Sequence, residues 1–130
     1  MKEHYELILF TAASDQYADI VLQTFEGHQY FDHILSRKQC LFIYEFGVYV
    51  KDLSILLNNR SLKDILIVDN KIESYSSNLE NGIPITSYYG EEEDKMLCIL
   101  RKYLLKLKDV EDVREHILKD FFLKDLTLIK

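Results

Sequence analysis

The sequence has no tryptophan, one proline and only four glycines among its 130 residues. So little proline and glycine leaves no room for a long flexible linker or a low-complexity arm. With 48% hydrophobic residues, a chain of this length can bury a core by itself. We therefore expect a single domain over residues 1–130.

Positive charge is also scarce, since 16 Lys and Arg stand against 22 Asp and Glu, giving a net charge of -6. We expect no direct nucleic-acid partner, because such a chain is poorly suited to neutralising phosphates. Lys and Arg form no block that would bind an anionic membrane surface. The apolar runs at residues 5–10 and 65–68 are too short to cross a bilayer, and residues 1–10 lack the order of a signal peptide.

Only two cysteines are present, Cys40 and Cys98, and they have neither a CxxC motif nor the spacing of a zinc site. This pattern predicts two reduced thiols packed in the core of an intracellular protein. The four histidines lack metal-ligand spacing as well.

The remaining pattern is one of strands that alternate with helices. Two apolar runs, at residues 5–10 and 64–68, predict strands that are buried on both faces of a parallel sheet. Further short strands are predicted at residues 31–35, 41–44 and 83–85, the last at a sheet edge because Pro84 cannot donate to a ladder. Helices are predicted at residues 15–25, 91–106 and 110–122, with one or two helical turns at 52–57. This alternation indicates an α/β domain.

Local signals refine the helices. Ser14 is placed to cap the helix at residues 15–25, and Gly27 is expected to end it. Apolar residues at helical spacing predict the faces that are buried. These are Ala18, Val21, Leu22 and Phe25 in the helix at residues 15–25, and Met96, Leu97, Leu100, Leu104 and Leu107 in the helix at residues 91–106.

Polar residues follow several of the predicted strands. Thr11 comes after the first strand, Lys51 after a short apolar pair, and Asp69-Asn70 after the strand at residues 64–68. In an open α/β sheet, ligands bind at the carboxyl ends of the strands. A hydroxyl, an ammonium and carboxylate or amide oxygens gathered there would suit a phosphoryl group and Mg²⁺. Each residue alone also has a simpler interpretation, as a local backbone contact or a turn residue.

The order of these pieces resembles one family throughout. The matching segments are Phe10-Thr11-Ala12, Tyr17-Ala18-Asp19, Arg37 with Cys40, Tyr49-Val50-Lys51-Asp52-Leu53, Ile67-Val68-Asp69-Asn70, Ser74-Tyr75 and Asn81-Gly82-Ile83-Pro84-Ile85. They are similar to the NLI-interacting-factor-like, or small C-terminal-domain, phosphatases of the haloacid dehalogenase superfamily. The tail from Glu111 resembles the "like 2" branch of that group.

The resemblance implies a Rossmann-like, mainly parallel sheet and a magnesium-dependent protein serine/threonine phosphatase. An Asp nucleophile would take the phosphoryl group from a phosphoserine or phosphothreonine protein, such as the RNA polymerase II C-terminal repeats, and water would hydrolyse the aspartyl-phosphate. The implied compartment is the nucleus or the cytoplasm. By position in the motifs, the implied roles are phosphoryl contacts for Thr11 and Lys51, Mg²⁺ ligation for Asn70, orientation of Lys51 and the metal's waters for Asp69, and substrate contacts for Tyr17 and Arg37.

Several departures from the family pattern stand beside these matches. The Asp-x-Asp-x-Thr motif that carries the nucleophile is absent from the sequence. Met1 resembles an internal methionine used as a start, whether by truncation, a gene-model error or a real shortening. The predicted sheet then lacks its central first strand. Lys71-Ile72 replaces a Ser-Pro, Tyr88-Tyr89 replaces a Trp-Phe, and residues 43–48 replace a His-Arg-Gly-Asn stretch with an insertion.

Two functional hypotheses remain open. In the first, the chain is an incomplete copy of a phosphatase and is inactive alone, with weak or no Mg²⁺ binding. In the second, it is a pseudophosphatase or a phosphopeptide-binding scaffold, like the mitochondrial translocase receptor relatives that the resemblance brings with it. In both, we expect Thr11, Lys51, Asp69 and Asn70 to converge at one sheet edge. The strands before Thr11 and Asp69 should either pair directly or leave a slot one strand wide between them, with their backbones on the order of 9–10 Å apart.

Overall fold

A computed structural model describes residues 1–85 and 96–123 of the chain, with the side chains of residues 122 and 123 left out. The chain divides into two compact units, Met1–Lys51 and Asp52–Lys130. Each unit contains its own short strands and helices, as expected for an α/β chain.

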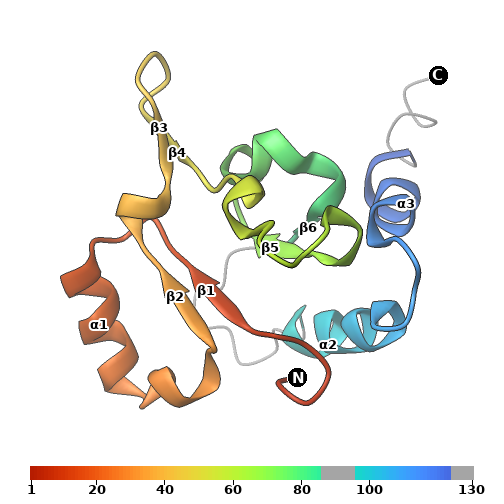
Figure 1. Ribbon diagram of the computed structural model, residues 1–130, viewed down its shortest axis with the longest axis horizontal. Coiled ribbons are helices and arrows are strands. Elements are labelled where there is room, and N and C mark those ends of the chain that lie inside the picture. Colours follow the sequence, from red (N-terminus) through yellow and green to blue (C-terminus); the bar gives the residue numbers. More distant parts are fainter. Residues whose placement is uncertain (86–95, 124–130) are drawn as a thin grey trace. The chain divides into compact units, whose positions relative to one another are not determined.

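The first unit is built around a parallel strand pair. Strand β1 (Ile8–Phe10) pairs with β2 (His33–Leu35), and helix α1 (Asp15–Thr24) with a 3₁₀ turn (Gly27–Tyr30) connects them (Figure 1). The parallel pairing requires such a crossover, because a tight turn cannot return the chain to the same direction. Both strands therefore end at the same edge, where the polar residues were predicted to gather.

The predicted capping of α1 is confirmed at its start and wrong at its end. The Ser14 side chain accepts a hydrogen bond from the Tyr17 backbone N–H at 3.3 Å. The chain turns out of the helix at Glu26, which adopts a left-handed conformation with φ of 53°, and not at Gly27. Gly27 is required for another reason, because a Cβ there would overlap the ring of Phe25 and crowd the side chain of Leu22.

A β-hairpin follows β2 in the first unit. Strands β3 (Leu41–Ile43) and β4 (Val48–Val50) pair antiparallel, with Phe42 opposite Tyr49. The connecting turn ends at Gly47, whose φ of +63° favours glycine and confirms the predicted turn. The hairpin projects from the end of the β1–β2 pair at which those strands finish (Figure 1).

The second unit holds another parallel pair. Strand β5 (Ile67–Asp69) pairs with β6 (Gly82–Pro84), and the crossover between them is a run of 3₁₀ turns (Ile72–Asn81). Shorter 3₁₀ helices lie at Leu53–Leu56 and Leu62–Asp64. Helix α2 (Met96–Leu107) and helix α3 (Val113–Ile117) follow, the latter capped by the Asp112 side chain and continued by a π-helical segment (Leu118–Leu123).

Two apolar clusters form the core of the second unit. One gathers Leu53, Ile65, Ile67 and Tyr75, and the other gathers Ile83, Val113 and Ile117 with partly buried residues of α2. Both clusters contact the β5–β6 pair, because the side chains of a strand point alternately to its two faces. The pair is thus covered on both sides within its own unit.

Buried amides tie the turns of the second unit together. The Asn81 side chain is fully buried and donates to the carbonyl oxygens of Leu62 and Ile65, at 2.7 and 2.8 Å. The side-chain oxygen of Asn78 accepts from the Leu53 backbone N–H at 3.1 Å. The two asparagines therefore satisfy backbone groups that the short turns leave without ladder partners.

The structure corrects several expectations about burial in the strands. Strand β1 was expected to be buried on both faces, yet all three of its residues are only partly buried. Its sheet contains two strands in the described part of the chain. The second strand begins at Ile67 and not at Asp64, because residues Leu62–Asp64 form a 3₁₀ helix.

The predicted helix faces and core cysteines are also wrong in part. On α1, Ala18 and Leu22 are buried, whereas Val21 and Phe25 are 40% and 53% exposed. On α2, Leu107 is buried but Leu97 is exposed. Cys40 is half-buried and Cys98 is exposed, although both are free thiols as expected. The predicted start of α2 lies outside the described residues, as does Tyr88-Tyr89. Within residues 1–85 and 96–123, no helix has both the length and the apolar content to span a membrane.

Candidate functional site

Thr11 lies where the parallel pair of the first unit ends. Its backbone N–H donates to the Leu35 carbonyl oxygen at 3.0 Å, which extends the β1–β2 ladder by one bond. Its side-chain oxygen accepts from the Ala13 N–H at 3.1 Å. This is the local backbone contact that was the simpler interpretation of Thr11. A hydroxyl that accepts one bond still has a proton to donate, so the contact leaves Thr11 able to bind an anion.

Arg37 is held against the loop that follows Thr11. Its backbone N–H donates to the Ala13 carbonyl oxygen at 2.9 Å, and its Nε donates to the Ala12 carbonyl oxygen at 2.8 Å. Its guanidinium carbon lies 5.3 Å from the centre of the Tyr49 ring, within range of a cation–π interaction. The fold therefore brings Thr11 and Arg37 together, although 26 positions separate them in the sequence.

A polar cluster that was not predicted stabilises the segment around Arg37. The buried Ser36 hydroxyl donates to the Asp15 carboxylate, and Lys38 forms an ion pair with the same carboxylate at 3.0 Å. Ser36 and Lys38 together hold the pKa of Asp15 below its usual value. The signal was present in the sequence, because Ser36 and Gln39 form a reciprocal capping box around a 3₁₀ turn.

Lys51 directly follows β4, and its positive charge acts on the Cys40 thiol. The Cys40 thiol is close to the carbonyl oxygens of Thr11 and Ser36, at 3.7 and 3.8 Å. Burial raises the pKa of Cys40, while the positive charges of Lys51 and Arg37 oppose that rise. Cys40 therefore contacts the backbone of Thr11 and Arg37, and the register of the hairpin pairs its neighbour Leu41 with Val50, the residue before Lys51.

Tyr17 lies on the first turn of α1, with its backbone tied to the Ser14 cap. The residue is 62% exposed. Core or rim packing is the competing interpretation for a Tyr on the first turn of a helix, and this exposure argues against the core but is compatible with the rim. A largely exposed ring on this turn is available to contact a bound molecule.

Asp69 and Asn70 belong to the second unit. Asp69 is the last residue of β5 and is buried, and its Oδ1 accepts from the Lys71 N–H at 3.0 Å. Asn70 is exposed. Tyr75 is also fully buried, and the pKa of its phenol is raised by burial and by the charges of Asp69 and Glu73. Asp69 and Asn70 adjoin each other in this unit, while the convergence of all four predicted residues stays a prediction.

The oxygen donors of Asp69 and Asn70 match the chemistry of Mg²⁺, which prefers carboxylate, carbonyl and water ligands. One carboxylate oxygen of Asp69 already accepts the Lys71 N–H. No group of three His, Cys, Asp or Glu side chains with the geometry of a metal site occurs among the described residues. The two residues fit a partial metal shell, which water or further ligands would have to complete.

Comparisons with known proteins place this arrangement in context. A sequence model described as "NLI interacting factor-like phosphatase" matches residues 1–114. The chain is 40% identical over 122 residues to the CTD small phosphatase-like protein 2 of Dictyostelium discoideum, covering 94% of this chain and 21% of that protein. It is 37% identical over 113 residues to the human carboxy-terminal domain RNA polymerase II polypeptide A small phosphatase 1, covering 87% and 42%.

A relative whose name gives a different role is similar to nearly the whole chain. A mitochondrial import inner membrane translocase subunit of Candida glabrata is 34% identical over 124 residues, covering 93% of this chain and 24% of that protein. The chain spans between about a fifth and two fifths of the length of these three relatives.

Proposed function

This chain belongs to the NLI interacting factor-like phosphatase family, and on that premise we propose that it forms part of a magnesium-dependent protein serine/threonine phosphatase domain of the haloacid dehalogenase type. The observation that carries the proposal is the meeting of Thr11 and Arg37 at the carboxyl end of the β1–β2 pair, with Lys51 directly after Val50, which pairs with the neighbour of Cys40. A hydroxyl donor and two cations at a strand-end edge suit a phosphoryl group.

Each residue has a role in this proposal. Thr11 donates a hydrogen bond to a phosphoryl oxygen, and Lys51 offsets the charge that the group carries during transfer. Arg37 and Tyr17 hold the peptide that bears the phosphorylated residue. Asp69 and Asn70 would hold Mg²⁺, which when bound would supply further positive charge for the transfer.

The 130 residues contain no Asp-x-Asp pair, which in the proposed mechanism supplies the nucleophile and the general acid. The chain by itself is therefore proposed to bind phosphorylated side chains without hydrolysing them. The substrates proposed are nuclear or cytoplasmic phosphoproteins, including the phosphorylated repeats of RNA polymerase II, by analogy with the human relative.

A second candidate is a phosphopeptide-binding scaffold without catalysis in any context. The similarity to a translocase subunit favours it. The two candidates agree on binding by the isolated chain. They differ in what happens when a segment with the nucleophile is supplied.

Two measurements on the purified chain test the proposal. Binding of a fluorescent phosphoserine peptide should exceed binding of its unphosphorylated form by about tenfold or more. Lys51→Ala should abolish most of that difference, whereas Lys102→Ala, an exposed lysine on α2, should not. Hydrolysis of an aryl phosphate with Mg²⁺ should stay at the background rate.

Turnover that survives repeated purification and is lost in Asp69→Asn would contradict the proposed inactivity of the isolated chain. The choice between the two candidates rests on complementation. Co-expression with the Asp-x-Asp-x-Thr segment of a family phosphatase should restore turnover if the chain is a phosphatase part, and should not if it is a scaffold.

A further inference from the structure

The β3–β4 hairpin carries a series of aromatic rings on one face. Phe42 and Tyr49 lie opposite each other across the two strands, with ring centroids 4.8 Å apart. Tyr44 follows Phe42 by two positions, and its ring lies edge-on to Phe42 at 6.1 Å. Because side chains alternate along a strand, Phe42 and Tyr49 share one face, and the other face carries Leu41, Ile43, Val48 and Val50. Tyr44 lies in the turn just after β3 and joins the first face through its contact with Phe42.

Arg37 continues this series toward the candidate site. Its guanidinium carbon lies 5.3 Å from the centre of the Tyr49 ring, and its Nε is bonded to the Ala12 carbonyl beside Thr11. We define Arg37, Tyr49, Phe42 and Tyr44 as the aromatic ladder. It runs without a break from the loop after Thr11 to the start of the hairpin turn.

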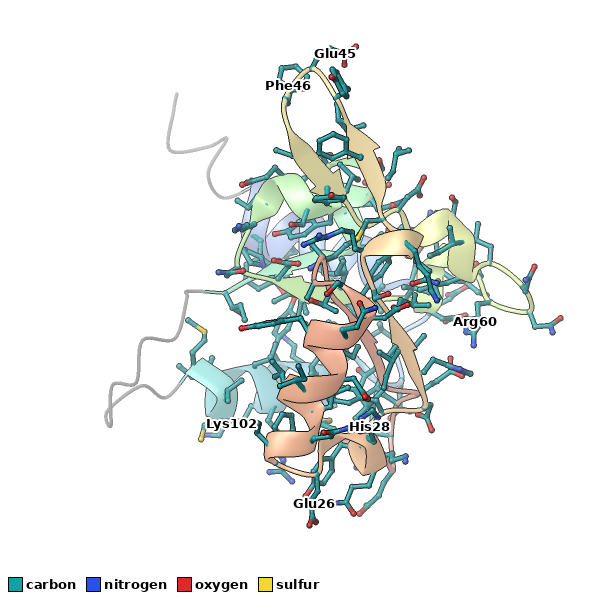
Figure 2. The ribbon with its side chains drawn as sticks, turned by 90° about the vertical axis from the view of Figure 1, so that its left-hand side faces the viewer. Glu26, His28, Glu45, Phe46, Arg60 and Lys102 are labelled. Atoms are coloured by element: carbon teal, nitrogen blue, oxygen red, sulfur yellow. The ribbon has the colours of Figure 1, made fainter. Side chains whose placement is uncertain are left out.

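The outer part of the ladder is exposed. Tyr44 is 88% exposed and Phe42 is 45% exposed, although both are large apolar rings. Contiguous apolar surface of this kind marks interaction sites on soluble proteins. The adjacent turn residues Glu45 and Phe46 point outward at the tip (Figure 2), and Phe46 lies beyond the ring series.

We propose that the aromatic ladder binds the segment of a phosphoprotein that flanks its phosphorylated residue, and that it selects apolar or aromatic flanks. The inference rests on the proposed function, because the inner end of the ladder must lie next to a bound phosphoryl group. Charge supports this occupant, since Arg37 stands at the inner end, Lys51 follows the inner end of β4, and neutral rings lie at the outer end.

The dimensions of the ladder suit an extended peptide. Successive steps of the ladder measure 5.3, 4.8 and 6.1 Å. An extended chain advances about 3.3 Å per residue, so the ladder can follow roughly four to five residues. Aromatic faces bind apolar, proline and aromatic side chains of such peptides, while the phosphate at one end fixes the register.

The test compares three fluorescent nonapeptides with the full chain as the binder. The first has phosphoserine flanked by alanines, the second has phosphoserine flanked by leucine and tyrosine, and the third is the second without phosphate. The leucine–tyrosine phosphopeptide should bind about five- to tenfold more tightly than the alanine phosphopeptide. Tyr44→Ser should abolish that advantage and lower the affinity for the alanine phosphopeptide by less than about twofold.

Phe46→Ser is the matched control, because Phe46 is an equally accessible ring on the same turn outside the ladder. It should preserve the preference for apolar flanks, and far-UV circular dichroism should show both variants folded. If Tyr44→Ser and Phe46→Ser lose the preference for apolar flanks to the same extent, the proposed ladder is wrong. So would equal affinity of the unmodified chain for both phosphopeptides.

The failure of the ladder can be distinguished from the failure of the proposed function. Phosphate-dependent binding without a flank preference would contradict the ladder alone. A flank preference that requires Tyr44 but ignores the phosphate would contradict the proposed function and support the ladder as a peptide surface. Binding of none of the three peptides would contradict both.

Discussion

The two units of the chain are stabilised by different kinds of contact. The first unit buries only three apolar side chains, Ala18, Leu22 and Val50, while ten of its large apolar side chains are exposed. The described part of the second unit buries eight, among them Tyr75 and Ile117, which are completely inaccessible. The first unit is held mainly by polar contacts at the ends of its strands, and the second by a packed core.

This difference links stability to function. The polar contacts of the first unit, such as those of Arg37 and Ser36, lie where the candidate site is built. Each such contact contributes about 0.5–1.5 kcal/mol, less than a fully buried apolar side chain in most cores. We therefore expect amide hydrogens of β1 and β2 to exchange faster than those of β5 and β6.

The largest expected effect comes from a pair of isoleucine substitutions, one in each unit. Ile117→Ala removes a completely buried side chain from the second unit and should lower the free energy of unfolding by about 3–4 kcal/mol. Ile20→Ala removes one that is 60% exposed in the first unit and should change it by less than about 0.5 kcal/mol. Urea unfolding followed by circular dichroism measures both, and similar values would break the comparison.

The second unit also depends on one polar side chain. Asn81→Ala leaves the carbonyl oxygens of Leu62 and Ile65 without their donor, which should cost about 2–3 kcal/mol in unfolding free energy. Asn58→Ala, at an exposed asparagine of the same unit, serves as the control and should be nearly neutral. If Asn81→Ala lowers the free energy of unfolding no more than Asn58→Ala does, the hydrogen bonds of Asn81 are not what stabilises these turns.

Alkaline pH sharpens the comparison further. Burial and a 2.6 Å hydrogen bond to Asp120 raise the pKa of Tyr103 well above its usual value near 10. Its neutral form is favoured in the folded state, so its contribution is complete below about pH 10 and is lost as pH rises above that. Tyr103→Phe should cost about 1 kcal/mol at pH 7 and flatten the loss of stability above pH 10.

A suitable control for that measurement is Tyr30→Phe, since Tyr30 is an exposed tyrosine of the first unit. It should leave the pH profile unchanged between pH 7 and 11. An unaltered alkaline slope in Tyr103→Phe would mean that another group governs the loss.

The smallest expected effect lies in the hairpin. Gly47 has a φ of +63° and open space around its Cα, so Gly47→Ala meets backbone strain but no clash. It should destabilise the hairpin by about 1 kcal/mol, and Gly47→Asn by less. Hydrogen exchange of the β3 and β4 amides reports the change. A uniform effect over both units would show that the hairpin does not open on its own.

The sequence predicted the existence and order of most elements because local signals determine them. The Ser14 cap, the turn at Gly47 and the parallel direction of strands joined by helical crossovers follow from side-chain chemistry and from the crossover rule, whereas which strands pair was not predicted. Burial was predicted less well. An apolar run indicates that a strand or helix can be covered, but what covers it depends on segments far away in the sequence. The half-buried β1 and the exposed Phe25 illustrate this.

The candidate site also has features that the sequence predicted and features that it did not. Residues at strand ends could be identified because the carboxyl edge of a parallel pair is a known location for ligands, and Thr11 and Arg37 do lie together there. The contact between Ser36 and Asp15 and the ring series on the hairpin were not predicted, although the capping pair of Ser36 and Gln39 is visible in the sequence. They depend on side-chain geometry between segments that the sequence pattern does not relate.

The turn between β3 and β4 has a practical consequence for handling the protein. Tyr44 and Phe46 are 88% and 78% exposed, and proteases such as chymotrypsin cleave after aromatic residues in accessible loop tips. We expect limited digestion to nick the chain there first. One fragment would then carry Thr11 and Arg37, and the other would carry Lys51. The protein concentration of a preparation would stay the same, but the residues proposed to bind the phosphoryl group would lie on two separate polypeptides.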